Sequence, residues 1–157
     1  MDKKFIRFYR DKKILILGAA GTIGRGLIEK FLALKVAQLT LVDNDETGIF
    51  YLLEEYKSEN IFSFTGDVRD REKIEKLAKG IDIIIHLAAY KHVVVSEHNP
   101  FDVVQTNIIG LENIIRAATA CNVKYILFAS SDKAVNPTNV MGASKLMGEN
   151  LITAANI

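Results

Sequence analysis

Short apolar runs alternate with longer segments of helical spacing along the whole chain. The short runs consist mainly of Ile, Leu, Val and Phe, without the every-second-residue alternation of a half-buried strand. A continuous apolar run of this length is typical of a parallel strand that is buried on both faces. We therefore expect strands at 14–17, 39–42, 61–64, 81–86 and 125–129.

The segments between these runs carry apolar residues at intervals of three and four, which predicts helices. Asn99 and Pro100 form a start signal for the fourth of them. Residues 5–9 are expected to form a short extra helix or arm. The main helices are expected at 23–34, 45–57, 71–79, 101–121 and from 140 to the end.

Five consecutive strand–helix units predict an α/β fold in a chain whose 157 residues suit one domain. Parallel strands joined by helices form right-handed crossovers, so we expect helices on both faces of the sheet. The specific expectation is a Rossmann-type, doubly wound parallel sheet of about five strands in the order 3-2-1-4-5.

Composition restricts the possible partners and the compartment. A net charge of +1 favours neither nucleic acid nor an anionic membrane surface as a partner. Cys121 is the single cysteine, so no internal disulfide can form, which fits a reducing compartment. Residues 1–13 lack the apolar run of a signal peptide, and no segment approaches the roughly 20 apolar residues of a membrane span. We expect a cytoplasmic protein.

A glycine-rich turn joins the first expected strand to the first expected helix, at the spacing of a dinucleotide-binding loop. The first glycine permits the tight turn, the second admits a pyrophosphate, and the third allows close packing of helix on strand. The helix N-terminus offers N–H groups to the phosphates. We therefore expect 1–157 to be an NAD(P)-binding Rossmann domain whose loop residues Gly18, Gly21, Thr22, Ile23 and Gly24 bind the cofactor.

An acidic residue ends the second expected strand. Asp43, followed by Asn44, stands where a carboxylate accepts hydrogen bonds from ribose hydroxyls and repels a 2′-phosphate. The pattern favours NAD, and NADP stays possible if a nearby basic residue accommodates the phosphate. The alternative is a plain turn with Asp43 as a helix cap.

The ends of the third and fourth strands should face the same crevice. Asp67, followed by Val68, could reach the exocyclic amine of adenine or could equally be a helix cap. The fourth strand ends in Leu87, Ala88 and Ala89, where small side chains would leave room for the cofactor's ribose. The three histidines have no metal-ligand context, so we expect no metal site.

Chemically active side chains follow the fifth strand. Ser131, Asp132 and Lys133 place a hydroxyl, a carboxylic acid and an amine side by side, where the nicotinamide should lie. In sugar-nucleotide dehydration a hydroxyl orients the C4 oxygen during its oxidation, a base removes the C5 proton, and an acid assists loss of the C6 hydroxyl. This role requires a lowered pKa for Lys133 and a raised pKa for Asp132. The alternative is a turn with a solvated ion pair.

Two further residues lie one turn apart on the last expected helix. Lys145 would bind the ribose hydroxyls and hold positive charge near the reacting centre. Met141 stands where nicotinamide enzymes of this kind usually place a tyrosine, and its thioether cannot relay a proton.

These motifs resemble the extended short-chain dehydrogenase/reductase family. More narrowly, they are similar to the CapD-like polysaccharide-biosynthesis dehydratases that act on UDP-N-acetylglucosamine. The resemblance covers about the N-terminal half of a full-length member, whose C-terminal half holds the UDP and sugar, and we expect that substrate domain to be absent here. It is carried by residues 18–24, 66–68, 86–93, 106–110 and 130–145.

The resemblance implies an NAD(P)-dependent lyase, a UDP-N-acetylglucosamine 4,6-dehydratase of the inverting type in polysaccharide biosynthesis. C4 is oxidised, water is eliminated across C5 and C6, and the hydride returns to C6. By this resemblance Ser131 is the catalytic hydroxyl, Asp132 the general acid and Lys133 the C5 base.

The resemblance also extends to residues around the cofactor. Lys145 corresponds to the ribose-binding lysine, and Asn107 to the family's structural asparagine at the cofactor site. Lys91 and Ser130 complete the expected cofactor contacts. Met141 is similar to one branch of these dehydratases, and it leaves the C4 proton acceptor open between two lysines, Lys133 and Lys145.

Two other functions stay open. An epimerase or reductase of the same family needs no elimination acid and base, so the adjacent Asp132 and Lys133 argue against it. A non-catalytic, truncated cofactor-binding module is favoured by Met141 and by the early end of the chain. In each case the apolar faces of the helices expected at 101–121 and 140–157 predict a homo-oligomer, specifically a homodimer through these helices.

Overall fold

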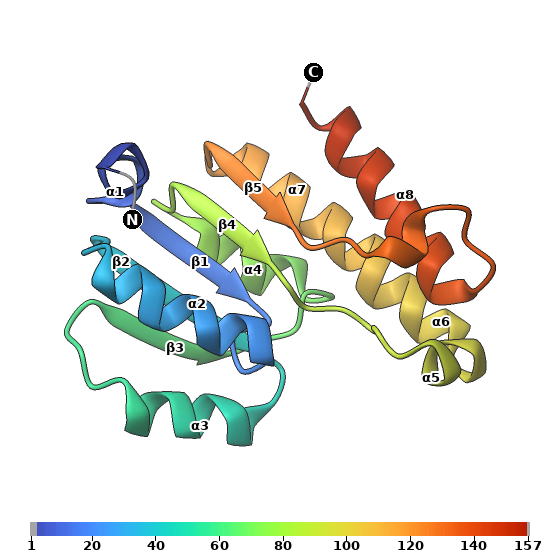
Figure 1. Cartoon of the computed structure of the whole chain (residues 1–157), viewed down its shortest axis with the longest axis horizontal. Coiled ribbons are helices and arrows are strands. Elements are labelled where there is room, and N and C mark those ends of the chain that lie inside the picture. The colour runs from blue at the N-terminus through green and yellow to red at the C-terminus, as the bar shows by residue number, and fades with distance from the viewer. Residues whose placement is uncertain (1–2, 157) are drawn as a thin grey trace.

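The computed structural model describes residues 3–156, whose strands form one parallel sheet in the order β3-β2-β1-β4-β5 (Figure 1). Each of the first four strands is followed by a helical segment that returns the chain to the start of the next strand. The predicted fold class and strand order are therefore confirmed. The strands are β1 (Lys13–Leu17), β2 (Gln38–Asp43), β3 (Ile61–Thr65), β4 (Ile83–His86) and β5 (Tyr125–Phe128).

The helices lie where the spacing predicts them, apart from one added helix and one irregular segment described below. None of the helices in the described residues is long and apolar enough to cross a membrane. The α-helices are α1 (Lys3–Tyr9), α2 (Thr22–Ala33), α3 (Glu46–Glu55), α4 (Arg71–Ala78), α5 (Val93–His98), α6 (Pro100–Val103), α7 (Gly110–Ala120) and α8 (Val140–Ala154).

The sheet separates two apolar clusters, because successive side chains of a strand point to opposite faces. Ile14 and Ile16 of β1 pack in the cluster beneath α2 and α3, while Leu15 and Leu17 pack in the cluster beneath α4 and α7 (Figure 1). All four side chains are fully buried. Burial contributes roughly 1.5–3 kcal/mol for each of them, so the central strand anchors the loop that follows it.

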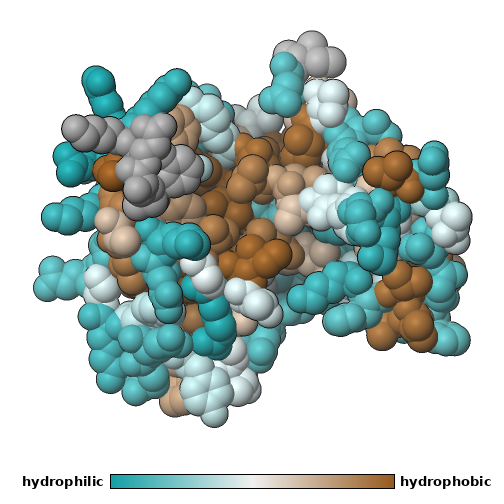
Figure 2. Space-filling model, viewed as in Figure 1, coloured by the Kyte–Doolittle hydropathy of each residue, from teal (hydrophilic) through white to brown (hydrophobic). Residues whose placement is uncertain are grey.

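The prediction that every strand is buried on both faces is wrong for the two edge strands. Phe62 and Phe64 of β3 and Tyr125 and Leu127 of β5 are exposed. Figure 2 shows apolar side chains between α2 and α8, on the side of the sheet where β5 exposes Tyr125 and Leu127 while β4 stays buried. A continuous apolar run therefore identifies a strand here, but not how many of its faces are covered.

The single helix predicted over 101–121 is wrong in one respect. Its middle, Val104–Ile109, is π-helical, and it joins α6 to α7. The side chain of Asn107 lies within this segment, where it accepts from the backbone N–H of Tyr90 and donates to the hydroxyl of Ser144 on α8. Such π segments occur often at functional sites, and this one joins three elements around the end of β4.

Helix α5 is an element that the sequence pattern did not predict. It begins with Val93, Val94 and Val95, which are β-branched and poor helix formers. Its Glu97 accepts a hydrogen bond from the backbone N–H of Val140 at 2.7 Å, at the start of α8. This tertiary contact overrides the local propensity.

Candidate functional site

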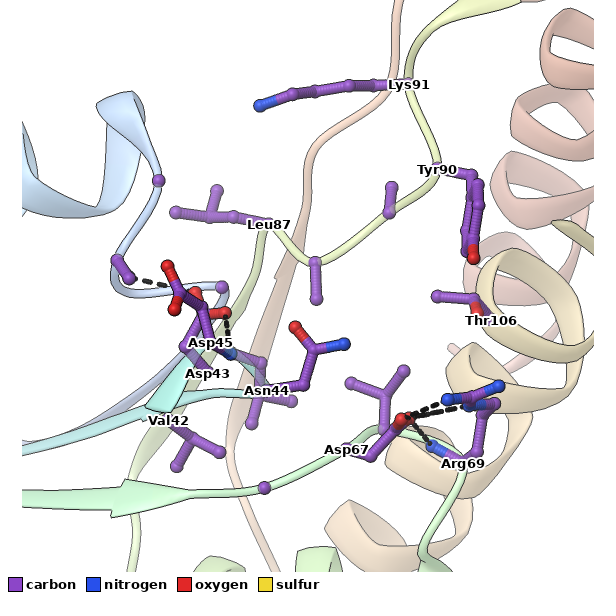
Figure 3. Close-up of a pocket in the computed structure, with 18 residues that line it drawn as sticks. Val42, Asp43, Asn44, Asp45, Asp67, Arg69, Leu87, Tyr90, Lys91 and Thr106 are labelled. Atoms are coloured by element: carbon purple, nitrogen blue, oxygen red, sulfur yellow. Dashed lines mark hydrogen bonds and ion pairs between the residues drawn. The ribbon is translucent and has the colours of Figure 1, made fainter. Parts of the chain in front are cut away.

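Two adjoining cavities lie at the carboxyl ends of the strands. The first, of about 310 Å³, is lined from the ends of β1 to β4 and by Thr106 (Figure 3). The second, of about 260 Å³, is lined by the glycine loop, by the segment after β5 and by α8. Gly18, Gly21, Leu87, Ala89 and Lys91 line both cavities. A ligand could therefore span them across the glycine loop.

The glycine loop has the backbone that the motif predicts. Gly18 has φ +90°, and a Cβ there would lie 2.6 Å from the backbone nitrogen of Ala88. A Cβ on Gly24 would lie 2.5 Å from the carbonyl oxygen of Ala19. No side chain caps α2 at Gly21, and Thr22 and Ile23 line the second cavity. The first backbone N–H groups of α2 therefore remain available to bind an anion.

Asp43 connects the end of β2 to the glycine loop. Its carboxylate accepts from the backbone N–H of Ala20 at 2.9 Å and from that of Asp45 at 3.1 Å (Figure 3). Asn44 and Asp45 line the first cavity beside it. Asp43 therefore does not cap α3, because its bonds hold the turn on either side of the strand end. Two carboxylates lie at this end of the cavity.

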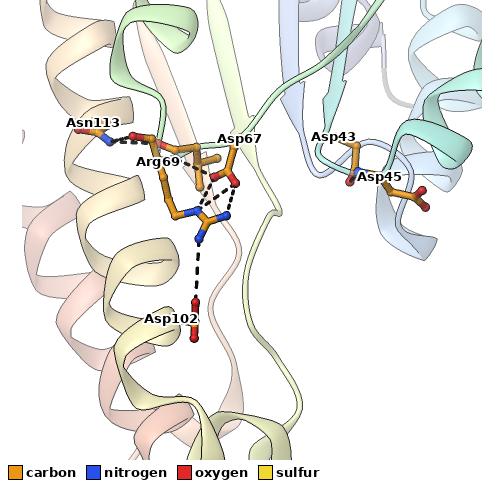
Figure 4. A network of polar contacts seen from close by, with 7 residues as sticks. Asp43, Asp45, Asp67, Arg69, Asp102 and Asn113 are labelled. Atoms are coloured by element: carbon orange, nitrogen blue, oxygen red, sulfur yellow. Dashed lines mark hydrogen bonds and ion pairs between the residues drawn. The ribbon is translucent and has the colours of Figure 1, made fainter.

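Asp67 lies across the first cavity and is paired with Arg69, a residue that the sequence analysis missed. The Arg69 guanidinium donates to both carboxylate oxygens, at 2.6 Å for the shortest contact, and these hydrogen bonds lower the pKa of Asp67. Arg69 also lies 4.0 Å from Asp102 of α6 (Figure 4). The helix cap suggested for Asp67 is wrong, since Asp70 caps α4.

The loop that carries Asp67 is held to α7. Asn113 donates from its amide to the carbonyl oxygens of Val68 and Arg69, at 3.1 and 3.2 Å (Figure 4). A Cβ on Gly110 would lie 2.6 Å from a methyl of Val68. Val68 lines the first cavity, so this edge of the cavity is fixed by packing against a long helix.

Further residues that were expected to contact the cofactor lie on or beside the segment that follows β4. Leu87 and Ala88 follow β4 and donate their backbone N–H groups to the carbonyl of Leu17. Lys91 lines both cavities, with its side chain extended across the opening (Figure 3). Asn107 lines neither cavity and is buried, which assigns it to holding the loop rather than to touching a ligand.

Ser131, Asp132 and Lys133 are in contact at the second cavity. The Ser131 hydroxyl donates to Asp132 at 2.9 Å, and it accepts from the backbone N–H of Lys133 at 3.2 Å. The Lys133 amine donates to the same Asp132 oxygen at 3.3 Å. Ser131 and Lys133 line the cavity, whereas the Asp132 side chain is 84% exposed.

Asp132 lacks the raised pKa that a resting general acid requires. Hydrogen bonds from the Ser131 hydroxyl and the Lys133 amine lower the pKa of Asp132. This geometry includes the solvated ion pair of Asp132 and Lys133. Asp132 is therefore a carboxylate that needs a delivered proton before it can act as an acid.

Lys145 is a buried cation at the floor of the second cavity. Its amine donates to the carbonyl of Ala129 at 2.8 Å and lies 4.7 Å from the centre of the Phe128 ring. Burial lowers the pKa of Lys145 to about 8. Met141, one turn earlier, is also buried and lines the cavity. Only a glycine fits at position 142, because a Cβ there would collide with the carbonyl of Lys133.

His86 lies behind this floor and touches Phe128, with ring centroids 5.7 Å apart. Neither ring nitrogen has a hydrogen-bond partner within the described residues. Burial, with a smaller effect from the charge of Lys145, lowers the pKa of His86 to about 3. His86 is therefore neutral across the physiological range.

Comparison with known proteins identifies a family that matches this sequence. The sequence pattern of the family described as polysaccharide biosynthesis protein matches residues 14–157. A UDP-N-acetylglucosamine 4,6-dehydratase (inverting) of Campylobacter jejuni is 38% identical over 94% of this chain and 45% of its own length. A UDP-glucose 4-epimerase of Rickettsia bellii is 35% identical over 92% of this chain and 43% of its own length.

A solved structure matches the fold closely. The X-ray structure of Pen from Bacillus thuringiensis superposes with a TM-score of 0.92 at 42% identity. The match covers 94% of this chain and 48% of that one. The chain therefore spans about half the length of the relatives it matches.

Proposed function

The chain belongs to the polysaccharide biosynthesis protein family, and from that membership we propose that it supplies the cofactor site and catalytic loop of a nucleotide-sugar 4,6-dehydratase. The proposed substrate is a UDP-N-acetylglucosamine-type sugar. The contact of Ser131, Asp132 and Lys133 at the mouth of the second cavity carries this proposal. Dehydration needs those three chemical types close together, whereas epimerisation needs no elimination acid and base.

The two cavities suit the two halves of a dinucleotide. Adenosine would lie in the first cavity between Asp43 and Asp67, and the pyrophosphate at the glycine loop. The carboxylates of Asp43 and Asp45 disfavour a 2′-phosphate, which supports NAD over NADP. Lys145 keeps N–H donors beyond the one given to Ala129, and these would bind the ribose hydroxyls of nicotinamide riboside. A dinucleotide held there would supply hydride transfer, as the acceptor of the C4 hydride and the donor of the same hydride to C6.

Ser131 provides a route for the C4 hydroxyl proton that needs no tyrosine. Its single hydrogen is already donated to Asp132, so its remaining lone pair can accept from the sugar hydroxyl. As C4 is oxidised, the hydroxyl proton passes to Ser131 while Ser131's own hydrogen passes to Asp132. This route leaves Met141 as an apolar wall, and it uses the ionised Asp132 as the proton acceptor.

The elimination then uses the proton that Asp132 has received. Asp132 gives it to the C6 hydroxyl, which leaves as water, while the amine of Lys133 takes the C5 proton. The Lys133 side chain is 48% exposed, so its ammonium gives one proton to solvent before this step and then takes the C5 proton as the neutral amine. Lys133 finally returns its proton to C5, and Asp132 is again a carboxylate.

Two measurements test the proposal. Calorimetry with this chain should show NAD binding more tightly than NADP. A chimera that joins this chain to the C-terminal half of the Campylobacter jejuni dehydratase, incubated with NAD and UDP-N-acetylglucosamine in heavy water, should then give a 4-keto-6-deoxy product that has lost one water. This product should carry deuterium at C5, because the Lys133 amine exchanges its protons with solvent before it returns one. Asp132→Asn should abolish that product and leave NAD binding unchanged.

Other outcomes would redirect the assignment. An isomer of unchanged formula identifies an epimerase. Cofactor binding without any turnover identifies a binding module. No binding of either dinucleotide contradicts the proposed site itself.

A further inference from the structure

Helix α8 is fastened to the end of strand β5 through one of its faces. Lys145 contacts the Phe128 ring and the Ala129 carbonyl. Gly148, one turn later, lies against the same ring, because a Cβ there would be 2.6 Å from the tip of Phe128. Positions three and four apart on a helix share a face, so the next position on this face is Glu149.

Glu149 contacts the residue that follows Ala129 at the end of β5, which is Ser130. The hydroxyl of Ser130 donates to the carboxylate of Glu149 at 2.5 Å. Hydrogen bonds to an ionised acceptor are the short, strong kind. Ser130 lines the second cavity, whereas Glu149 does not. The bond therefore orients a cavity residue from outside the cavity.

The direction of this bond decides what Ser130 offers to a ligand. A serine hydroxyl has one hydrogen and two lone pairs, and Glu149 takes the hydrogen. Toward the cavity Ser130 is therefore an acceptor. Lys145 beside it is a donor only. The second cavity thus presents a donor on the buried Lys145 and, beside it, an acceptor on the exposed Ser130, which Glu149 orients.

We propose that Glu149 is a positioning residue that fixes Ser130 as an acceptor for a donor on the nicotinamide riboside half of the dinucleotide. The donor is the carboxamide N–H or a ribose O–H. This inference rests on the proposed NAD site and adds to it the residue that sets the polarity of its floor. Without Glu149 the Ser130 hydrogen is free to turn into the cavity, and the acceptor is lost for part of the time.

Calorimetry with three ligands of graded length tests the inference. NAD carries the whole nicotinamide riboside half, ADP-ribose keeps the ribose without the nicotinamide, and ADP lacks both. The variants are Ser130→Ala, Glu149→Leu and Glu149→Gln, whose amide oxygen can still accept from Ser130. Glu112→Leu is the matched control, since Glu112 is a partly exposed glutamate on α7 that accepts from Arg116 away from both cavities.

Loss of one hydrogen bond predicts about a five- to tenfold weaker affinity for NAD in Ser130→Ala and Glu149→Leu. Glu149→Gln should retain most of the affinity, and Glu112→Leu all of it. ADP affinity should change by less than about twofold throughout. An equal loss for ADP-ribose assigns the donor to the ribose, and no loss for ADP-ribose assigns it to the carboxamide.

Two results would overturn the inference. If NAD affinity is unchanged in both Ser130→Ala and Glu149→Leu, Ser130 is not an acceptor for the cofactor. If NAD and ADP weaken together, Glu149 only supports the fold. A wild-type chain that binds neither ligand instead overturns the proposed function, and this inference falls with it.

Discussion

The amine of Lys145 lies 4.7 Å from the centre of the Phe128 ring, on the inner side of helix α8. No carboxylate forms an ion pair with Lys145 among the described residues, so the buried cation is compensated by one ring and one carbonyl. Burying this amine without a carboxylate lowers the stability of the fold, but it leaves N–H donors that can bind the hydroxyl groups of a ligand. The change of folding stability with pH should therefore reveal the protonation state of Lys145.

Lys145→Met should stabilise the fold and weaken NAD binding by more than about tenfold. The pKa of Lys145 is about 8 when folded and 10.5 when exposed. The folded state therefore binds fewer protons between these values, and wild-type stability should rise as the pH increases from about 8 to 10.5. Below pH 8 the cost is fully present, at about 3 kcal/mol. Urea unfolding at several pH values should show this slope in the wild type, and an equal slope in Lys145→Met would contradict it.

His86 should make the fold sensitive to acid. Its pKa is about 3 when folded and 6.5 when exposed, so the unfolded chain binds the proton first as the pH falls. Stability is unaffected above pH 6.5 and is lost below it, by about 1.4 kcal/mol for each pH unit down to pH 3. In His86→Leu the urea concentration at the unfolding midpoint should change less with pH between 4.5 and 6.5 than it does in the wild type. A matched change at exposed His98 should leave the wild-type slope in place.

Asp43 should set the preference for NAD. Asp43→Asn keeps a side-chain acceptor for the Ala20 N–H and removes the charge that repels a 2′-phosphate. We expect NADP affinity to rise relative to NAD by about tenfold, which corresponds to removal of one close like-charge contact. Calorimetry with both dinucleotides measures the ratio. A ratio equal to that of the wild type would show that Asp43 only shapes the turn.

Asp67 should distinguish an amino group from a carbonyl on the purine. As a carboxylate paired with Arg69, it can accept from adenine but not donate to hypoxanthine. Asp67→Asn should weaken the binding of NAD and reduce the ratio of its affinity to that of nicotinamide hypoxanthine dinucleotide. Competitive binding of the two dinucleotides measures this. An unchanged advantage would place the purine away from Asp67.

The apolar surface of the long helices should bring two copies together. Phe101 is 85% exposed, and Val104, Leu146 and Met147 are also exposed on the neighbouring helices. We propose a homodimer through this surface, seen by light scattering at micromolar concentration. Phe101→Asp should shift the mass to that of a monomer, whereas Phe50→Asp on α3, on the opposite face of the sheet, should not. A monomeric wild type would contradict the proposal.

The strand order was predictable because each strand–helix unit fixes its own crossover, and the carboxyl ends of the strands then place Gly18, Asp43 and Asp67 at one edge. The two helical elements that differ from the prediction depend on contacts distant in sequence. The π segment around Asn107 is held by Tyr90 and Ser144. Helix α5 is fixed by the bond of Glu97 to Val140.

The two missed polar pairs have different causes. The role of Arg69 needs the direction of its side chain, although its spacing of two from Asp67 was a visible signal. Glu149 and Ser130 are 19 residues apart and meet only when α8 takes its rotation over β5. Residue type alone could not reveal either contact.

Strand β1 lies between β2 and β4, and β4 follows it by about 70 residues of chain. The carbonyl of Leu17 is reached only when Leu87 and Ala88 arrive, so the backbone around Gly18 is closed by a late, long-range step in folding. The proposed dinucleotide site therefore forms only once β4 has paired with β1. A bound dinucleotide should therefore slow the unfolding of the whole sheet as one unit, and protect β1 and β4 equally from hydrogen exchange.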